Sequence, residues 1–302
     1  AGTLGACMAS TVPASEWRGY GRRVPDPIRA DSVPILPAAT VMLVRDGASG
    51  LEVFMLQRTH SASFARGQFV FPGGKVDDLD HADSLDAVTD GDDASVSARM
   101  GMPEGGLAWV VAAVRECFEE AGVLLARPAG GDAPIVFDEA DDERFEAHRR
   151  AVHAGDRSLA SVCAEESLRI LADRVLLVAH WVTPAGERKR FDTRIFLTTA
   201  PDGQAPLHDD VETIASLWVR PPDALEMWRA GELQMFPPTV AALRFLEPHA
   251  TVDDALTAGA AVGVPPVIVP KMIVDDTGRV AGVRLPGDPD YDDTPGPEFV
   301  LV

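Results

Sequence analysis

Three glutamates stand close together in the 302-residue chain, in the segment AAVRECFEEAGV at residues 112–123. On an α-helix, which turns about 100° per residue, Glu116, Glu119 and Glu120 fall within one arc of about 100°. The apolar residues fall on the opposite side, as a core-facing stripe does: Val110, Val114, Cys117, Phe118 and Ala121. Carboxylates this close repel one another unless a cation compensates their charge. Mg²⁺ is such a cation, because it binds to carboxylates and to substrate phosphates at the same time. The segment predicts either a divalent-metal site or, more simply, a solvated acidic helix face.

A double glycine upstream and the residues around the glutamates favour the metal site. FPGG covers residues 71–74, and Arg-Glu-x-x-Glu-Glu-x-Gly covers residues 115–122. Together they resemble the signature of the Nudix hydrolase superfamily, G-x5-E-x7-R-E-U-x-E-E-x-G-U, where U is a bulky apolar residue. The resemblance implies an α/β Nudix fold, which is an α-β-α sandwich around a mixed sheet. It also implies hydrolysis of a diphosphate linked to another moiety, with Mg²⁺ or Mn²⁺ as the cofactor.

The same resemblance implies a role for each residue of the motif. Glu116 and Glu120 would be the main metal ligands, and Glu119 would be a further ligand or an acid beside them. Arg115 would orient the carboxylates, and the backbone carbonyl of Gly74 would add a ligand. Such a site suits phosphate chemistry, because a metal clamps the phosphates and lowers the pKa of a bound water.

Three positions fit the signature less directly. The chain between Gly74 and Arg115 is about 27 residues longer than the signature allows, and Leu107 stands eight residues before Arg115, where the signature has glutamate. Gly101 has the signature's spacing from Arg115, which we interpret as coincidence because FPGG has the stronger context. Glu212, ahead of the last strand of the expected core, is a candidate catalytic base or ligand, with a surface glutamate as the alternative.

The residues around the signature indicate which class of diphosphate is the substrate. Residues 58–74 resemble the motif that precedes the box in coenzyme A-hydrolysing Nudix enzymes, although Ser63 stands where an arginine is expected. The blocks at 181–184, 190–197, 217–225 and 236–239 resemble the peroxisomal-type coenzyme A diphosphatases, which have a long insertion in the Nudix box. The resemblance covers about residues 36–247. The candidate substrate-binding residues are Arg58, Arg66, Gly73, Arg190 and Arg194, with Arg149, Arg150 and His153 as further candidates, although His153 has no partner pattern.

The branch resemblance implies that coenzyme A or an acyl-coenzyme A is cleaved to 3′,5′-ADP and (acyl-)4′-phosphopantetheine. Two alternatives stay open. One is a Nudix hydrolase for ADP-ribose, NADH or a nucleotide sugar. The other is a Nudix-fold ligand-binding module without catalysis, which Leu107 favours.

Apolar periodicity and turn residues divide the chain into three parts. We expect an N-terminal arm at 1–31, a Nudix domain at 32–247 and a C-terminal extension at 248–302 with a hairpin around Asp276-Thr277-Gly278. Insertions are expected at about 77–105, as a loop or a loosely helical segment, and at 128–173, as a helix-prone block. The expected strands are 38–46, 51–59, 68–74, 174–184, 190–200 and 212–221, and the expected helices are 106–122, 222–230 and 238–247. The first two strands are β-branched runs separated by Asp-Gly-Ala-Ser-Gly, which predicts a hairpin.

Composition limits the partners. Twenty-seven Lys and Arg against 47 Asp and Glu give a formal charge of −20, which disfavours binding to nucleic acid or to anionic lipid. Three scattered cysteines argue against a disulfide framework, and the apolar runs are too short to span a bilayer. We therefore expect a cytoplasmic protein that acts on a small-molecule diphosphate. A homodimer, the commonest assembly, stays open.

Overall fold

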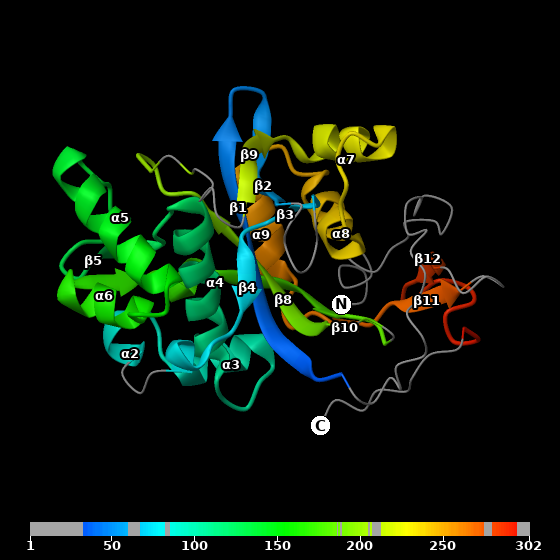
Figure 1. Ribbon diagram of the computed structural model, residues 1–302, viewed down its shortest axis with the longest axis horizontal. Coiled ribbons are helices and arrows are strands. Elements are labelled where there is room, and N and C mark those ends of the chain that lie inside the picture. The colour runs from blue at the N-terminus through cyan, green and yellow to red at the C-terminus, as the bar shows by residue number, and fades with distance from the viewer. Residues whose placement is uncertain are drawn as a thin grey trace.

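A mixed β-sheet forms the centre of the protein (Figure 1). The computed structural model describes residues 33–59, 67–81, 85–185, 187, 189–204, 206, 213–274 and 280–294. Strands β1 (Ile35–Gly47) and β2 (Gly50–Arg58) form the antiparallel hairpin that the sequence predicts, and β1 pairs in parallel with β8 (Arg190–Thr199). The sheet order is β10-β7-β8-β1-β2-β3, with β4 paired to β1 and β9 paired to β2. The remaining strands of this sheet are β3 (Phe69–Val70), β4 (Gly73–Lys75), β7 (Leu176–Val182), β9 (Thr213–Val219) and β10 (Val267–Ile268).

The segment 68–74, predicted as one strand, is two short strands. Strand β3 pairs with β2, whereas β4 pairs with β1. The chain crosses between these partners at Phe71-Pro72, because proline has no N–H to continue a ladder. The carbonyl of Pro72 still accepts a hydrogen bond from the Val41 N–H at 2.9 Å. This crossing brings the double glycine beside β1.

Helices cover both faces of the sheet, which confirms the α/β sandwich. Along β1, Val41 and Leu43 face α4 (Gly106–Ala121), whereas Met42 and Val44 face the opposite layer, because side chains alternate along a strand. That opposite layer contains α7 (Pro221–Ala230), α8 (Pro237–Leu246) and α9 (Val252–Ala261). Helices α7 and α8 begin with proline, whose fixed φ suits the first helical turn. Helix α9 is not among the helices expected from the sequence, although Thr251 caps it by accepting a hydrogen bond from the Asp254 N–H.

The first insertion is more ordered than a loop. It contains η3 (Asp78–His81), α2 (Leu85–Val88) and α3 (Asp93–Met100). Several of its acidic residues cap helices. Asp92 accepts a hydrogen bond from the Ser95 N–H at the start of α3, and Asp93 accepts from the N–H groups of Gly105 and Leu107 at the start of α4. The acidic insertion therefore anchors the N-terminus of α4.

The second insertion packs against the other end of α4 (Figure 1). Its elements are β5 (Ala126–Pro128), α5 (Glu139–His153), α6 (Leu159–Glu165), β6 (Leu168–Ile170) and η4 (Ala172–Arg174). Strands β5 and β6 pair antiparallel, and Arg127 and Arg169 both bind Asp90 of the first insertion. The two insertions thus support each other around one helix.

The C-terminal residues contain a second small sheet. Strands β11 (Lys271–Val274) and β12 (Val280–Arg284) pair antiparallel, and the predicted turn between them lies outside the described residues. This pair lies at the opposite end of the molecule from the insertions (Figure 1). Among the described residues, none of the helices combines the length and apolar character that crossing a membrane requires.

Candidate active site

Helix α4 carries the three glutamates on a face that the sheet and insertions enclose. All 16 of its residues are buried. Glu116 is 9% exposed, Glu119 is 8% exposed and Glu120 is 3% exposed. The helix ends at Gly122, whose φ of 69° is in the left-handed region that favours glycine. A solvated acidic helix face is therefore excluded, and the burial of three carboxylates needs a compensating partner.

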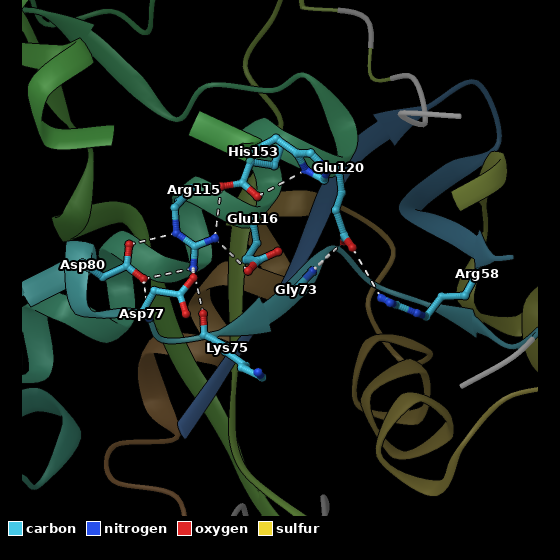
Figure 2. Close-up of polar contacts among 10 residues, drawn as sticks. Arg58, Gly73, Lys75, Asp77, Asp80, Arg115, Glu116, Glu120 and His153 are labelled. Atoms are coloured by element: carbon cyan, nitrogen blue, oxygen red, sulfur yellow. Dashed lines mark hydrogen bonds and ion pairs between the residues drawn. The ribbon is translucent and has the colours of Figure 1, made fainter. Parts of the chain in front are cut away.

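Arg115 is a partner of two of these carboxylates, those of Glu116 and Glu119 (Figure 2). Its Nε and Nη2 donate to the two oxygens of Asp80 at 2.9 and 3.0 Å, and Nη2 also donates to the Lys75 carbonyl at 2.7 Å. Its Nη1 donates to Glu116 Oε1 at 2.8 Å and to Glu119 Oε1 at 3.1 Å. One guanidinium thus joins η3, β4 and α4, as the expected orienting role requires.

Asp80 resolves the apparent gap at Leu107. The count back from Arg115 reaches Leu107, which is buried among apolar residues of the core. The count forward from Gly74 reaches Asp80 after five intervening residues, which is the glycine-to-glutamate spacing of the signature. The extra residues follow the acidic position rather than precede it, so Asp80 pairs with Arg115 and Leu107 does not mark a lost group. A forward count would have found this residue in the sequence.

The double glycine lies directly against the carboxylates. Gly73 N–H donates to Glu120 Oε2 at 2.9 Å. A Cβ on Gly74 would lie 2.2 Å from Glu116 Oε1, so only glycine leaves room for that carboxylate. Arg58 at the end of β2 reaches Glu120 Oε1 with its Nη1 at 3.5 Å. Residues 58, 73, 74, 115, 116, 119 and 120, all expected in the site, are therefore together.

Two residues of α5 reach the site from the second insertion. Arg149 Nε donates to the backbone carbonyl of Glu119 at 2.9 Å. His153 Nδ1 lies 3.6 Å from Glu119 Oε2 (Figure 2). The sequence names both as basic residues of an insertion, but no local pattern indicates that α5 docks on this end of α4.

The electrostatics of the site are unbalanced toward negative charge. Burial lowers the pKa of Arg115, but its hydrogen bonds to Asp80 and the charges of Glu116 and Glu119 outweigh burial and raise it above its usual range. Burial raises the pKa of Glu116 and of Glu119, and Arg115 offsets this only in part. Mg²⁺ and Mn²⁺ take oxygen ligands such as carboxylates. The double glycine, which has no Cβ, leaves room beside these carboxylates. The residues present therefore fit a divalent cation.

The other predicted residues lie elsewhere. Arg190 is buried, and its Nε donates to the Thr183 carbonyl at 3.1 Å. Arg194 is also buried, with its guanidinium 3.8 Å from the centre of the Trp109 ring. Both side chains are buried, so their contact with a substrate stays a prediction. Arg66 and Glu212 lie outside the described residues.

A family model described as the NUDT19 Nudix domain matches residues 92–246, which is half of the chain and includes α4 with its glutamates. The chain belongs to this family. This Nudix protein is 25% identical over 242 residues to a Xenopus laevis protein named acyl-coenzyme A diphosphatase NUDT19, covering 70% of this chain and 63% of the relative. It is 27% identical over 240 residues to the Homo sapiens protein of that name, covering 68% of this chain and 63% of that relative. The chain thus spans less than two thirds of the length of these relatives.

A solved structure supports the Nudix fold. The crystal structure of a NUDIX hydrolase from Alicyclobacillus acidocaldarius superimposes with a TM-score of 0.62 at 28% identity. The match covers 75% of this Nudix protein and 97% of that chain. The predicted family and fold class are therefore confirmed.

Proposed function

We propose that this Nudix protein is a diphosphohydrolase that cleaves coenzyme A or an acyl-coenzyme A to 3′,5′-ADP and (acyl-)4′-phosphopantetheine. The observation that carries the proposal is the buried set of carboxylates that Arg115 holds against the double glycine of β4. Membership of the NUDT19 Nudix family and the names of the relatives support the substrate.

Glu116, Glu119 and Glu120 would hold Mg²⁺ or Mn²⁺, with the Gly74 carbonyl as a further ligand. A bound divalent ion neutralises diphosphate charge and lowers the pKa of a coordinated water. In the reaction, a water oxygen bonds to one phosphorus of the diphosphate while the bond from that phosphorus to the bridging oxygen breaks. The bridging oxygen leaves with the other phosphate, and the water proton goes to a carboxylate or to solvent.

The chain's own residues orient these groups. Arg115 fixes one oxygen each of Glu116 and Glu119, and Gly73 N–H fixes one oxygen of Glu120. Arg58, beside Glu120, offers a cation at the edge of the site where an anionic substrate would arrive. Glu119 and Glu212 are the candidate acceptors for the water proton. Preorganised charges of this kind supply most of the catalysis in phosphoryl chemistry.

The pairing of Asp80 with Arg115 weighs against the non-catalytic alternative, because Leu107 was the feature that favoured it. The substrate alternatives, which are ADP-ribose, NADH and nucleotide sugars, share the same reaction and differ in the group beyond the diphosphate. A cytoplasmic location and a homodimer stay predictions from the sequence, as does the division into arm, Nudix domain and extension.

Product analysis tests the proposal. The protein is incubated with coenzyme A, and in parallel with ADP-ribose and NADH, each with Mg²⁺, with Mn²⁺ and with EDTA. Chromatography with mass detection should find 3′,5′-ADP and 4′-phosphopantetheine only in the metal-containing coenzyme A reactions. Turnover of ADP-ribose or NADH in place of coenzyme A would overturn the substrate, and absence of turnover with all of them would overturn the enzyme assignment.

A further inference from the structure

Helix α5 attaches to the last turn of α4, although it belongs to an insertion. Arg149 Nε donates to the Glu119 carbonyl, and a Cβ on Gly122 would lie 3.2 Å from Arg149 Nη1. A cation at this position suits the negative end of the α4 dipole. The contact fixes the distance between α5 and the backbone of Glu119.

One turn further along α5, His153 reaches the side chain of the same glutamate. Its Nδ1 lies 3.6 Å from Glu119 Oε2, while Arg115 Nη1 holds Oε1 at 3.1 Å (Figure 2). The two oxygens of one carboxylate thus face nitrogen-bearing side chains from two different helices. The side chain of His153 is 33% exposed and that of Glu119 is 9% exposed, so His153 lies at the rim of the site and Glu119 inside it.

We propose that His153 is a positioning residue that the second insertion delivers to Glu119, where it fixes the carboxylate plane for hydrolysis. Arg115 restrains the Glu119 carboxylate through one hydrogen bond to Oε1, and the terminal side-chain torsion of glutamate has a broad energy minimum. A second group 3.6 Å from Oε2 narrows the range of that torsion further. Outer groups that orient ligand side chains in metal sites typically matter about 10- to 100-fold for metal affinity or activity. The inference rests on the proposed function, since Glu119 is assigned there.

Four forms of the full chain test the role: wild type, His153→Ala, His153→Asn and His249→Ala. Asparagine places its amide nitrogen close to the position of histidine Nδ1, so it keeps the contact without the ring. His249 follows the end of α8, edge-on to Phe245, and provides a matched loss of a histidine ring. The readouts are kcat and KM for coenzyme A, the dissociation constant of Mn²⁺ from its electron paramagnetic resonance signal, and Tm.

We expect His153→Ala to lower kcat by about tenfold and to weaken Mn²⁺ binding several-fold, with KM within about twofold and Tm close to wild type. His153→Asn should restore both quantities, and His249→Ala should change neither. Wild-type kcat and Mn²⁺ affinity in His153→Ala would overturn the proposal. So would a change confined to KM, which indicates substrate contact, or a failure of His153→Asn to restore either quantity. If wild type hydrolyses no diphosphate, the proposed function fails, while the Mn²⁺ measurements still decide whether His153 orients the site.

Discussion

Two clusters of acidic and basic side chains lie near α5 and differ in charge balance. In the insertion cluster, ligand-type atoms of His148, Glu165 and Glu166 lie within 4.8 Å of one another, an arrangement that by residue type alone would suit a metal. Its charges are already paired, because Arg157 binds Glu165 at 2.6 Å and Arg144 binds Glu166 at 3.0 Å. Both ring nitrogens of His148 have partners, in Glu166 and Arg157.

The active-site cluster has one guanidinium at its centre for four carboxylates: three are buried, those of Asp80, Glu116 and Glu119, and the fourth, that of Asp77, is exposed. Burial raises the pKa of Glu119 more than Arg115 lowers it. In the insertion cluster burial also raises the pKa of Glu166, but the hydrogen bond from His148 and the charge of Arg144 outweigh it and lower the pKa. The difference teaches that uncompensated buried negative charge, rather than a gathering of acidic residues, marks the place for a divalent cation.

The largest expected contrast is between matched glutamine variants of the two clusters. Glu116→Gln or Glu120→Gln removes one ligand charge at little change in volume and should lower turnover of coenzyme A by at least about a hundredfold. Glu166→Gln should keep turnover within about twofold, because its charge serves an ion pair. Rates of 3′,5′-ADP release measure both, with circular dichroism to verify folding. Full activity in either active-site variant would contradict the site assignment.

A smaller loss should follow a single added methyl group. The Cβ of Gly74→Ala would lie 2.2 Å from Glu116 Oε1 and must displace that carboxylate. We expect turnover to fall by about ten- to a hundredfold, since small displacements of catalytic groups carry costs of this order. Gly130→Ala is the control, because an added Cβ there meets no heavy atom within 4 Å. Equal rates in the two variants would show that the Glu116 position is not critical.

Metal binding should separate the clusters by thermal stability. A ligand at about a hundred times its Kd stabilises the native state by roughly 2.7 kcal/mol, which is several degrees in Tm for a chain of this size. Mn²⁺ should therefore raise the Tm of wild type and of Glu166→Gln in scanning calorimetry, but not that of Glu116→Gln. If Mn²⁺ raised the Tm of Glu116→Gln but not that of Glu166→Gln, the cation would bind at the insertion cluster instead.

The smallest effect concerns acid stability of the insertion cluster. A carboxyl group whose folded-state pKa is lowered stabilises the fold above its unfolded pKa and loses that contribution as the pH falls through the folded pKa. The ion pairs of Glu166 should contribute about 1 kcal/mol or less at pH 7. The Tm of wild type should be higher than that of Glu166→Gln at pH 7, and this difference should shrink as the pH is lowered below about 4. A difference that is constant with pH would contradict an ionic origin.

Local sequence signals predicted much of the fold. The β-branched runs joined by Asp-Gly-Ala-Ser-Gly predicted the β1–β2 hairpin, and the apolar stripe ending at Gly122 predicted α4 almost to the residue. These elements follow from side-chain periodicity and backbone preference, which act between near neighbours. The missed α9 also has such signals, in the Thr251 cap and the acidic first turn.

The sequence by itself determined the acidic face of α4, the double glycine and the arginine beside the first glutamate, because motif spacing records them directly. The spacing forward from Gly74 also records Asp80, but only the tertiary structure decided which charged groups contact one another. Asp80 reaches Arg115 because an insertion folds back after η3, and His153 reaches Glu119 because α5 docks on the end of α4. Contacts between residues that are 34 or 35 positions apart depend on how whole elements pack, and local periodicity carries no record of that packing.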